Sequence, residues 1–532
     1  MSKIAKYLNG HILGEVSARE SRLRNFSTDR SILKIQPNLV VFPRIADDIR
    51  KIMRFSWQLA EKGHNIPVTA RGFGGSTDGS SITNGIVLDI SRHMDNVKEL
   101  DIRTRSVKVQ AGANFSKLNL AIASQAMSIL SSPAGERLTV GGAIAMNLPS
   151  EKFNHGTLLD VTRSLEVILS DGSVIKTGRI SKKELGEKLA QQDFEGEVYR
   201  KLDALIEESQ SAISKIDADA SYGYNGLTKV KLPDGSFDLT PLFFGSLGTL
   251  GVITEADFRA EYIVDETKFM VVAFSNRDDA RDFIDLSKKF QPNIIELFDG
   301  KMFEAAVASG KKYDFYLDRV SKKLATKLVL VVGISDKTSK KIKQTFKKIE
   351  GLAERFDGAT TWAPDDSEAE KAELETIRDV REILRSRAGV IKEEIYPIQG
   401  VYVPLERFEQ FYLGLQKLAL KHSIPAPVQG SALTNVFEIL AEFDFSKVSD
   451  RRKALQFITD LNALLATVDG EFGFGAGEGR IYGSFVARYL DDDVLKVFDE
   501  VREIFDPNNI LNKGVKGLVN AKELVKNVRS GK

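Results

Sequence analysis

The sequence predicts an α+β protein with two domains that differ in their pattern of strands, helices and glycines. Up to about residue 265, short strand-like runs alternate with glycine-rich loops, whereas beyond Ala260 longer strand and helix patterns alternate with fewer glycines. A chain of 532 residues is long enough for two to four domains. We place a first domain at residues 1–265, a second at residues 266–470, and a C-terminal segment at residues 471–532.

The composition is that of an ordinary globular protein and narrows the chemistry. The chain has 42% hydrophobic residues and a formal net charge of +1, so composition does not favour nucleic acid as a partner. It has no cysteine, which excludes disulfides, a thiolate nucleophile and cysteine-bound clusters. Any redox chemistry must therefore come from a bound cofactor.

Neither the N-terminus nor any apolar run has the features of a membrane or secretion signal. The first ten residues lack an apolar core followed by a cleavage site, and the run Leu328–Ile334 is too short to span a bilayer. We expect a cytoplasmic protein without an integral membrane segment. The tail Lys522–Lys532 is locally basic, and we interpret it as solvated.

The first domain is organised around the first glycine loop, residues 72–81, between the strand-like runs Ile66–Thr69 and Ile86–Ile90. Its glycines and small hydroxyl residues can present successive backbone N–H groups to an anion such as a pyrophosphate. A Gly/Ser surface loop is the plain alternative, and spacing alone leaves the two close to even. The loop matches neither the Walker pattern nor the dinucleotide fingerprint, because it lacks Gly-Lys-Ser/Thr and leads into a strand.

Around this loop, periodicity predicts the other elements of the first domain. An Asp-Gly turn between two β-rich runs predicts a hairpin over residues 164–178. Strands are expected at residues 39–43 and 107–112, and helices at residues 46–62 and 115–127.

Two further clusters of small residues follow. The second glycine segment is Ser131–Asn147 and the third glycine segment is Phe243–Ala256. Small residues let a backbone approach a flat ligand or a neighbouring strand, and for the second segment alone tight packing is slightly favoured. Three such clusters in the first domain suggest one elongated ligand threaded between them.

The second domain has the pattern of an α+β unit with a mainly antiparallel sheet. Strands are expected at residues 269–274, 328–334, 400–403 and 436–440, and helices at residues 277–290, 337–356 and 405–422. The C-terminal segment has a glycine-rich run at Gly473–Arg480, a helix at residues 492–505 and an Asp-Pro stop.

Six segments in order resemble the vanillyl-alcohol-oxidase-like family of FAD enzymes, in particular its D-lactate dehydrogenase and glycolate oxidase branch. Any one segment could arise by chance, but six in the expected order and spacing do not. They are Ser27–Ser31, Val41–Pro43, Arg71–Ser76, Thr139–Gly142, Gly245–Thr254 and Phe505–Asn512.

The resemblance implies an FAD-binding domain of the vanillyl-alcohol-oxidase (PCMH) type in two parts, and an α+β cap with an antiparallel sheet that forms the substrate pocket. Residues 72–77 would bind the FAD pyrophosphate, Thr139, Gly141 and Gly142 would line the flavin cleft, and Asn512 would lie near the isoalloxazine. The implied cofactor-binding residues are Arg71, Gly72, Phe73, Gly74, Gly75, Ser76, Thr77, Pro133, Thr139, Gly141, Gly142, Ala145, Asn147, Val252, Ile253 and Asn512.

The chain departs from the family pattern at the position of covalent flavin attachment. Many relatives attach FAD through a histidine in the first loop, but this chain has Gly75 there. We therefore expect non-covalent FAD.

A second departure concerns a metal. Relatives of the 2-hydroxyacid branch supply histidines to a divalent ion, and the alignment places Ser431, Phe437 and Ala476 where those histidines would stand. Phenylalanine and alanine cannot coordinate a metal. We expect no catalytic metal, so the reaction type carries over from the family but the particular acid does not.

Hydride transfer to a flavin needs a base for the substrate's hydroxyl proton and cations for an acidic substrate. His155 follows a flavin-lining segment and is the candidate base, at even odds with a structural role; Glu478 and Tyr224 are weaker candidates, and His422 is interpreted as a solvated helix-end residue. The resemblance implies that Arg378 grips a carboxylate, with an exposed ion-paired helix as the alternative, and Arg480 competes for that role.

The hypothesis is an FAD-dependent dehydrogenase or oxidase acting on a hydroxylated small molecule, either 2-hydroxyacid-like or a sugar or polyol. The alternatives are a flavin-binding subunit or scaffold that has lost this catalysis, and a related reductase or epimerase-type protein acting on a sugar derivative. The sequence does not specify the electron acceptor, and it is compatible with a homo-oligomer.

Overall fold

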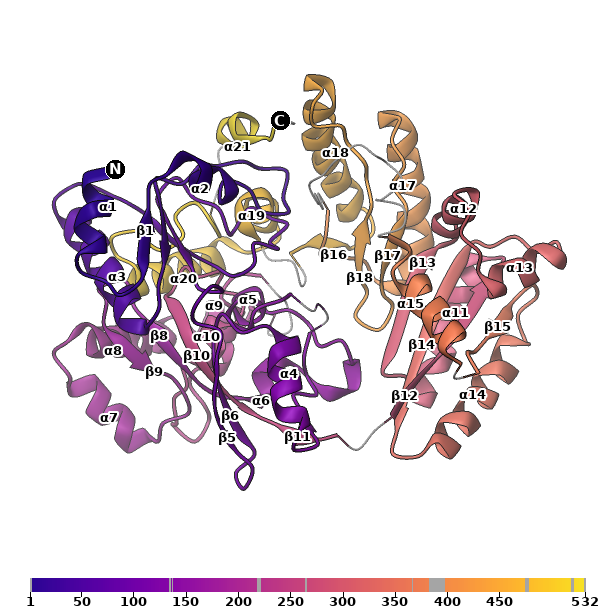
Figure 1. Cartoon of the computed structure of the whole chain (residues 1–532), viewed down its shortest axis with the longest axis horizontal. Helices are drawn as coiled ribbons and strands as arrows, with labels where there is room; N and C mark the ends of the chain where they lie inside the picture. The colour runs from indigo at the N-terminus through magenta and orange to yellow at the C-terminus, as the bar shows by residue number, and fades with distance from the viewer. Residues whose placement is uncertain are drawn as a thin grey trace. The chain divides into compact units, whose positions relative to one another are not determined.

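A computed structural model describes residues 2–133, 135, 137–217, 222–263, 266–365, 367–381, 398–473, 478–517 and 521–530. The chain divides into two compact units (Figure 1). The first unit combines Met1–Ser150, Thr157–Tyr262 and Phe472–Arg529, and the second combines Glu151–Gly156, Ile263–Glu471 and Ser530–Lys532. Each unit is described separately below.

The first sheet of unit 1 carries the first glycine loop. Its strands lie in the order β1-β2-β4-β3, with β2, β4 and β3 parallel and β1 antiparallel to β2. The bounds are β1 Glu15–Ser17, β2 Leu39–Phe42, β3 Val68–Arg71 and β4 Ile86–Asp89. Every residue of β2 and β4 is buried, which fits the continuous apolar runs of parallel strands covered on both faces.

The second sheet of unit 1 is antiparallel, in the order β5-β6-β10-β8-β9. Its strands are β5 Val97–Asp101, β6 Ser106–Gln110, β8 Thr162–Ile168, β9 Val174–Lys176 and β10 Val252–Arg259. β8 and β9 form the hairpin predicted from the Asp-Gly turn, with Gly172 at φ 87°. A short pair of β7 Met127–Ser128 and β11 Glu261–Tyr262 completes the strands of this unit.

Helices surround the two sheets of unit 1 (Figure 1). They are α1 Ser2–Asn9, α2 Glu20–Asn25, α3 Ala46–Glu61, α4 Phe115–Ala123, α5 Val140–Met146, α6 Leu158–Val161, α7 Lys182–Ala190, α8 Phe194–Glu208, α9 Gln210–Ile213, α10 Thr240–Phe243, α19 Gly479–Val486, α20 Asp492–Phe505, α21 Ala521–Asn527 and the 3₁₀ turn η2 Asn225–Lys229. α4 ends before the predicted Met127, because Ala126 has φ 51° and Met127 begins a strand. α20 has the predicted bounds.

The segment after α20 joins the first sheet. The Asp506 carboxylate accepts hydrogen bonds from the backbone N–H of Ile510 and Leu511, at 3.0 and 2.7 Å, which turns the chain after the helix. The Val68 N–H then donates to the Ile510 carbonyl at 2.7 Å, and the Asn512 N–H donates to the Val68 carbonyl at 2.9 Å. This ladder beside β3 places Asn512 next to the first glycine loop.

Unit 2 is built on an eight-stranded sheet in the order β15-β12-β14-β13-β17-β18-β16-β19. All strand pairs for which the described residues give a register are antiparallel, as predicted for the second domain. The strands are β12 Glu266–Phe274, β13 Ile294–Asp299, β14 Leu328–Asp336, β15 Thr360–Trp362, β16 Val401–Tyr402, β17 Val428–Ser431, β18 Val436–Ile439 and β19 Glu471–Phe472.

Helices cover the sheet of unit 2 (Figure 1). They are η1 Phe153–His155, α11 Arg277–Ser287, η3 Lys288–Phe290, α12 Gly300–Ala308, α13 Asp314–Ser321, α14 Ser339–Ala353, α15 Glu368–Arg378, η4 Leu405–Arg407, α17 Phe408–His422 and α18 Val448–Ala466. Alternate residues of the central strands, such as Val271 and Val329, pack against apolar side chains of α12, α13 and α15. Among the described residues, no helix has the length and apolar character needed to cross a membrane.

Candidate functional site

The three glycine segments predicted from the sequence meet in unit 1. Gly72 of the first loop packs so closely on Thr139 of the second segment that a Cβ at Gly72 would overlap the threonine hydroxyl. The backbone N–H of Leu247, in the third segment, donates to the Ala145 carbonyl at 2.9 Å. The fold therefore brings together three backbone segments that are about 70 to 170 residues apart in sequence, as one elongated ligand would require.

Asn512 joins two of these segments with its side chain. Its Nδ2 donates to the carbonyls of Ser80 in the first loop and Leu247 in the third segment, at 2.8 and 2.7 Å. Its Oδ1 accepts from the Thr69 hydroxyl of β3 at 2.9 Å. The Asn512 residue is 2% exposed, so these hydrogen bonds are made away from water.

The first glycine loop is buried over most of its length, which does not fit a plain surface loop. Residues 76–81 are buried and residues 72–75 are half-buried. The Arg71 guanidinium lies directly beneath Gly74, where a Cβ would overlap it, and its Nη1 donates to the Ser81 carbonyl at 3.3 Å. Gly74 has φ 78°, a conformation that favours glycine. Arg71 thus packs against the loop at Gly74 and binds it at Ser81, while residues 72–75 stay partly exposed.

Two buried polar atoms of this loop have no hydrogen-bond partner in the described part of the chain. They are Thr77 Oγ1 and the Asp78 Oδ2 oxygen. Buried polar atoms in native proteins nearly always have partners, because an unpaired one costs about 1–3 kcal/mol. A hydroxyl without a partner within residues 72–77 fits a loop that holds a phosphate-bearing cofactor.

Asp78 is the buried acid of the loop. Its Oδ1 accepts from the Ser80 N–H at 2.9 Å and from the Ser76 hydroxyl. Burial raises the pKa of Asp78 to about 6, because the charged form loses its hydration, while these hydrogen bonds act in the opposite direction. The Asp78 carbonyl accepts the backbone N–H groups of Arg480 and Ile481, at 2.8 and 3.2 Å, and so fixes the start of α19.

The second glycine segment starts α5. The Thr139 hydroxyl accepts from the Gly142 N–H at 3.2 Å and caps this helix. A Cβ at Gly141 would lie 2.9 Å from the Ala111 Cβ, so packing accounts for glycine there. Asn147 ends the helix in the left-handed conformation, with φ 48°.

Open space lies beside the third glycine segment. Gly248 has φ 71° and is half-buried, and no heavy atom of the described residues lies within 4 Å of the position that a Cβ would take. Its neighbour Thr249 is held by hydrogen bonds from its hydroxyl to the Ser246 carbonyl, at 2.6 Å, and with the Tyr224 hydroxyl, at 2.7 Å. This segment is ordered by the protein while leaving room at its surface.

The other residues implied for the cofactor lie in β10, in α5 and in the segment before α5. Val252 and Ile253 begin β10 and pair with Ile168 and Val167 in the second sheet. Pro133 is buried, and Ala145 is half-buried near the end of α5. Their contact with a cofactor stays a prediction.

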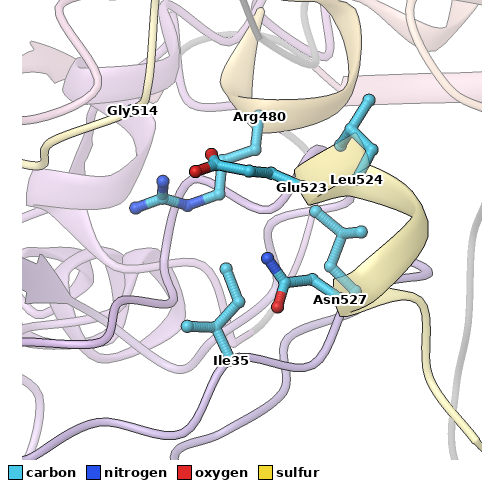
Figure 2. A pocket seen from close by; sticks show the side chains of 7 residues that line it. Ile35, Arg480, Gly514, Glu523, Leu524 and Asn527 are labelled. Carbon is cyan, nitrogen blue, oxygen red and sulfur yellow. The ribbon is translucent and has the colours of Figure 1, made fainter. Parts of the chain in front are cut away.

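Arg480 lies in α19 and binds the residue that follows the first glycine loop. Its Nε and Nη2 donate to the Ile82 carbonyl, at 3.2 and 2.9 Å. Burial lowers the pKa of Arg480 to about 10, although Asp29 and Asp78 oppose this shift. Figure 2 shows its side chain in the wall of a small pocket, which the sequence did not indicate. The pocket is lined by Leu33, Ile35, Arg480, Gly514, Glu523, Leu524 and Asn527.

Arg378 ends α15 in unit 2 and is held by two acids. Its Nε and Nη2 form a two-pronged pair with Glu296 at 2.6–3.1 Å, and Nη2 also reaches Glu151 at 3.1 Å. Its guanidinium lies 4.7 Å from the centre of the Phe269 ring. Although burial opposes it, these carboxylates raise the pKa of Arg378 above its ordinary value. The guanidinium is thus partly buried and paired, unlike that of an exposed ion-paired helix.

His155 lies in the turn η1, which belongs to unit 2 by its contacts. The turn is attached to that unit by a hydrogen bond from the Phe153 N–H to the Asn293 carbonyl, at 2.9 Å. His155 is half-buried. Its role as a base stays a prediction.

The weaker candidates are occupied by other contacts. Glu478 accepts from the Gly223 N–H at 2.8 Å and forms a buried ion pair with Lys516. Tyr224 is buried, and burial raises its pKa to about 12. The interpretation of His422 as solvated was wrong: it is 8% exposed and its Nε2 lies 2.8 Å from Asp460.

The positions aligned with metal-binding histidines differ in their surroundings. Phe437 of β18 is fully buried and packs on Phe408, with ring centroids 5.0 Å apart, while Ser431 ends β17. Ala476 lies outside the described residues. Within the described part of the chain, no group of three or more His, Cys, Asp or Glu side chains is arranged to hold a metal ion.

Two family models match the chain. The model of the FAD binding domain matches residues 37–178, and the model of the C-terminal domain of FAD linked oxidases matches residues 264–515. The first match contains the first and second glycine segments, and the second match includes the sheet of unit 2 and Asn512.

Similar proteins include D-2-hydroxyglutarate dehydrogenase of Pseudomonas putida, 25% identical over 95% of this chain and 51% of that protein. This chain thus spans about half the length of that relative. The mitochondrial cytochrome-linked D-lactate dehydrogenase of Arabidopsis thaliana is 24% identical over 90% of this chain and 73% of its own. Glycolate oxidase subunit GlcD of Bacillus subtilis is 22% identical over 90% and 88%.

Solved structures share the fold. The 4-ethylphenol oxidase of Gulosibacter chungangensis superposes with a TM-score of 0.70 at 15% identity and covers 98% of both chains. An alkyldihydroxyacetonephosphate synthase gives a TM-score of 0.66 at 13% identity, covering 96% of this chain and 86% of its own. These likenesses confirm the predicted fold class.

Proposed function

Because the chain belongs to the FAD-linked oxidases and has FAD as its cofactor, we propose that it oxidises a hydroxylated small molecule, either 2-hydroxyacid-like or a sugar or polyol, without a catalytic metal. The observation that carries this proposal is the meeting of the three glycine segments around a loop whose buried Thr77 hydroxyl has no partner among the described residues. The domain at residues 266–470 would supply the side chains that bind the substrate.

FAD is held without a covalent bond at the first loop. Position 75 is glycine and has no side chain that could attach the flavin. Binding instead uses the half-buried backbone of residues 72–75 and the Thr77 hydroxyl, which suit the pyrophosphate. Thr139, Gly142 and Gly248 would line the flavin, since Gly142 is half-buried and Gly248 has open space beside it in the described part of the chain.

Bound FAD supplies the acceptor for a hydride from the carbon that carries the substrate's hydroxyl. A base of the chain removes the hydroxyl proton as that carbon becomes a carbonyl, and His155 is the residue that we assign to this role. To Arg71 and Asn512 we assign a positioning role, since they hold the first loop in place by their hydrogen bonds to Ser81 and Ser80.

An acidic substrate would bind through cations, since Phe437 cannot coordinate a metal. Arg378 is the proposed partner of a substrate carboxylate, because a guanidinium grips a carboxylate with two parallel hydrogen bonds. Glu296 already makes such a pair with it. A substrate carboxylate would therefore either bind to N–H donors of Arg378 that Glu296 does not use, or displace Glu296 from the guanidinium. Neutral polyols would bind without displacing Glu296.

The engagement of Arg378 also favours a second candidate function. If Glu296 and Glu151 keep the guanidinium permanently, the chain binds FAD as a subunit or scaffold that has lost hydroxyacid oxidation. In this second function the protein would still bind FAD in unit 1 but would not bind a substrate.

Anaerobic titration of the FAD-loaded protein tests the proposal. Bleaching of the flavin absorbance by at least one member of a panel of 2-hydroxyacids, sugars and polyols is the expected result. Flavin that none of them bleaches, but that dithionite reduces, would instead support the scaffold function. Arg378→Lys should raise the concentration needed for half-maximal bleaching by an acid more than that needed for a polyol.

A further inference from the structure

Residues 521–529 pack against the rest of unit 1, whereas the sequence predicted a solvated tail at Lys522–Lys532. Arg529 is only 4% exposed. Its backbone N–H donates to the Ile32 carbonyl at 2.9 Å, and its guanidinium donates to the carbonyls of Leu33, at 3.2 Å, and Asp29. The Lys34 N–H in turn donates to the Asn527 carbonyl at 2.8 Å. The tail is thus paired with residues 29–34 by backbone and side chain.

Residues 29–34 in turn bind the first glycine loop at its middle and at its last residue. The Arg30 N–H donates to the Ser76 carbonyl at 2.9 Å. The Ser81 hydroxyl donates to the Asp29 carboxylate at 3.2 Å, and the Ser31 N–H donates to its other oxygen at 3.0 Å. Arg529 therefore acts on the loop indirectly. It binds the carbonyl of Asp29, whose carboxylate accepts from Ser81, and the next residue, Arg30, donates to Ser76.

The helix α21 meets a second support of the same loop. Figure 2 shows Glu523, Leu524 and Asn527 of α21 forming one wall of the pocket whose other wall includes Arg480. Arg480 is bound to the carbonyls of Asp78 and Ile82 in and beside the loop. The tail thus lies against two of the groups that position the first glycine loop, residues 29–34 and Arg480.

We propose that residues 521–529 are a C-terminal strap that holds the first glycine loop in the shape that binds FAD, and that Arg529 is its positioning residue. This inference rests on the proposed binding of FAD at that loop. A glycine-rich loop has many conformations to lose, so contacts that order it before binding strengthen the binding. The hydrogen bonds of a buried guanidinium to two carbonyls suit this task.

The test compares Arg529→Ala with Arg529→Lys and the matched control Lys526→Ala in the full chain. Lys526→Ala removes the same charge from an exposed position of α21. FAD is removed from each variant, and the dissociation constant is measured by flavin titration, together with the melting temperature of the FAD-free protein. We expect Arg529→Ala to weaken FAD binding about 10-fold to 100-fold, the loss for charged hydrogen bonds, with partial recovery in Arg529→Lys and no change in Lys526→Ala.

A destabilised variant far from the tail separates positioning from general instability. Leu202→Ala removes a fully buried side chain from α8 and should lower the melting temperature while leaving the FAD dissociation constant of the folded protein unchanged. The inference is overturned if Arg529→Ala binds FAD as tightly as the unsubstituted chain does. It is also overturned if Leu202→Ala, at a melting temperature equal to that of Arg529→Ala, weakens FAD binding to the same extent as Arg529→Ala. If the original chain binds no FAD at all, the proposed function fails first.

Discussion

Replacing Asn512 by alanine tests whether the junction of the glycine segments is the cofactor site. The change removes three buried side-chain hydrogen bonds, to Thr69, Ser80 and Leu247. At about 1 kcal/mol for each bond, the free energy of unfolding should fall by about 3 kcal/mol. Asn512 also has φ 41°, a left-handed conformation in which alanine costs about 1 kcal/mol more. The total is within the usual stability of a folded domain, so the variant should fold.

The part of this loss that reaches the cofactor can be worked out from the same bonds. Two of the three bonds join the first and third glycine segments. Losing them removes about 2 kcal/mol of the free energy that keeps these segments in their binding arrangement, which is equivalent to about 30-fold weaker FAD binding. The assay is titration of the FAD-free protein with FAD, beside urea unfolding. Asn65→Ala is the control, because Asn65 also binds the C-terminal segment, through the Asn508 carbonyl at 2.8 Å, but is exposed.

The control should change both quantities by less than about 0.5 kcal/mol. Unchanged FAD affinity in Asn512→Ala, accompanied by the expected loss of stability, would refute the reasoning. It would mean that the junction is structural and that FAD binds elsewhere.

Two further predictions concern pH and metal. Because burial raises the pKa of Asp78 from its ordinary 3.8 to about 6, its contribution to the free energy of unfolding should be full below about pH 4 and be lost as the pH rises through 6. Urea unfolding of Asp78→Asn should lack this part of the slope; equal slopes in both proteins would contradict the assignment. Dialysis against a chelator should leave the rate of flavin bleaching by substrate unchanged, since the aligned position holds Phe437, and activity restored by Zn²⁺ or Mn²⁺ would show that a metal site exists.

The local patterns of the sequence predicted much of the fold, because they depend on neighbouring residues. The apolar runs of β2 and β4, the helix α20 and the Asp-Gly hairpin β8–β9 follow from periodicity and turn chemistry. The end of α4 was missed, since the left-handed Ala126 carries no signal in its residue type.

The contacts that assemble the site could not be predicted in the same way. The sequence placed Asn512 near the flavin, but its hydrogen bonds to Ser80 and Leu247 join residues more than 260 positions apart. The burial of Arg529 depends on residues 29–33 in the same manner. The helical pattern around Arg378 showed a charged face, and only the fold reveals Glu296 on the neighbouring strand β13 as its partner.

The most direct measurement of the central claim is the flavin content of the purified chain before and after acid precipitation. Three converging glycine segments with Gly75 at the attachment position predict one FAD per chain, released completely into the supernatant. Flavin that stays with the precipitated protein would contradict the non-covalent site, and a colourless chain that FAD cannot reconstitute would contradict the cofactor site itself.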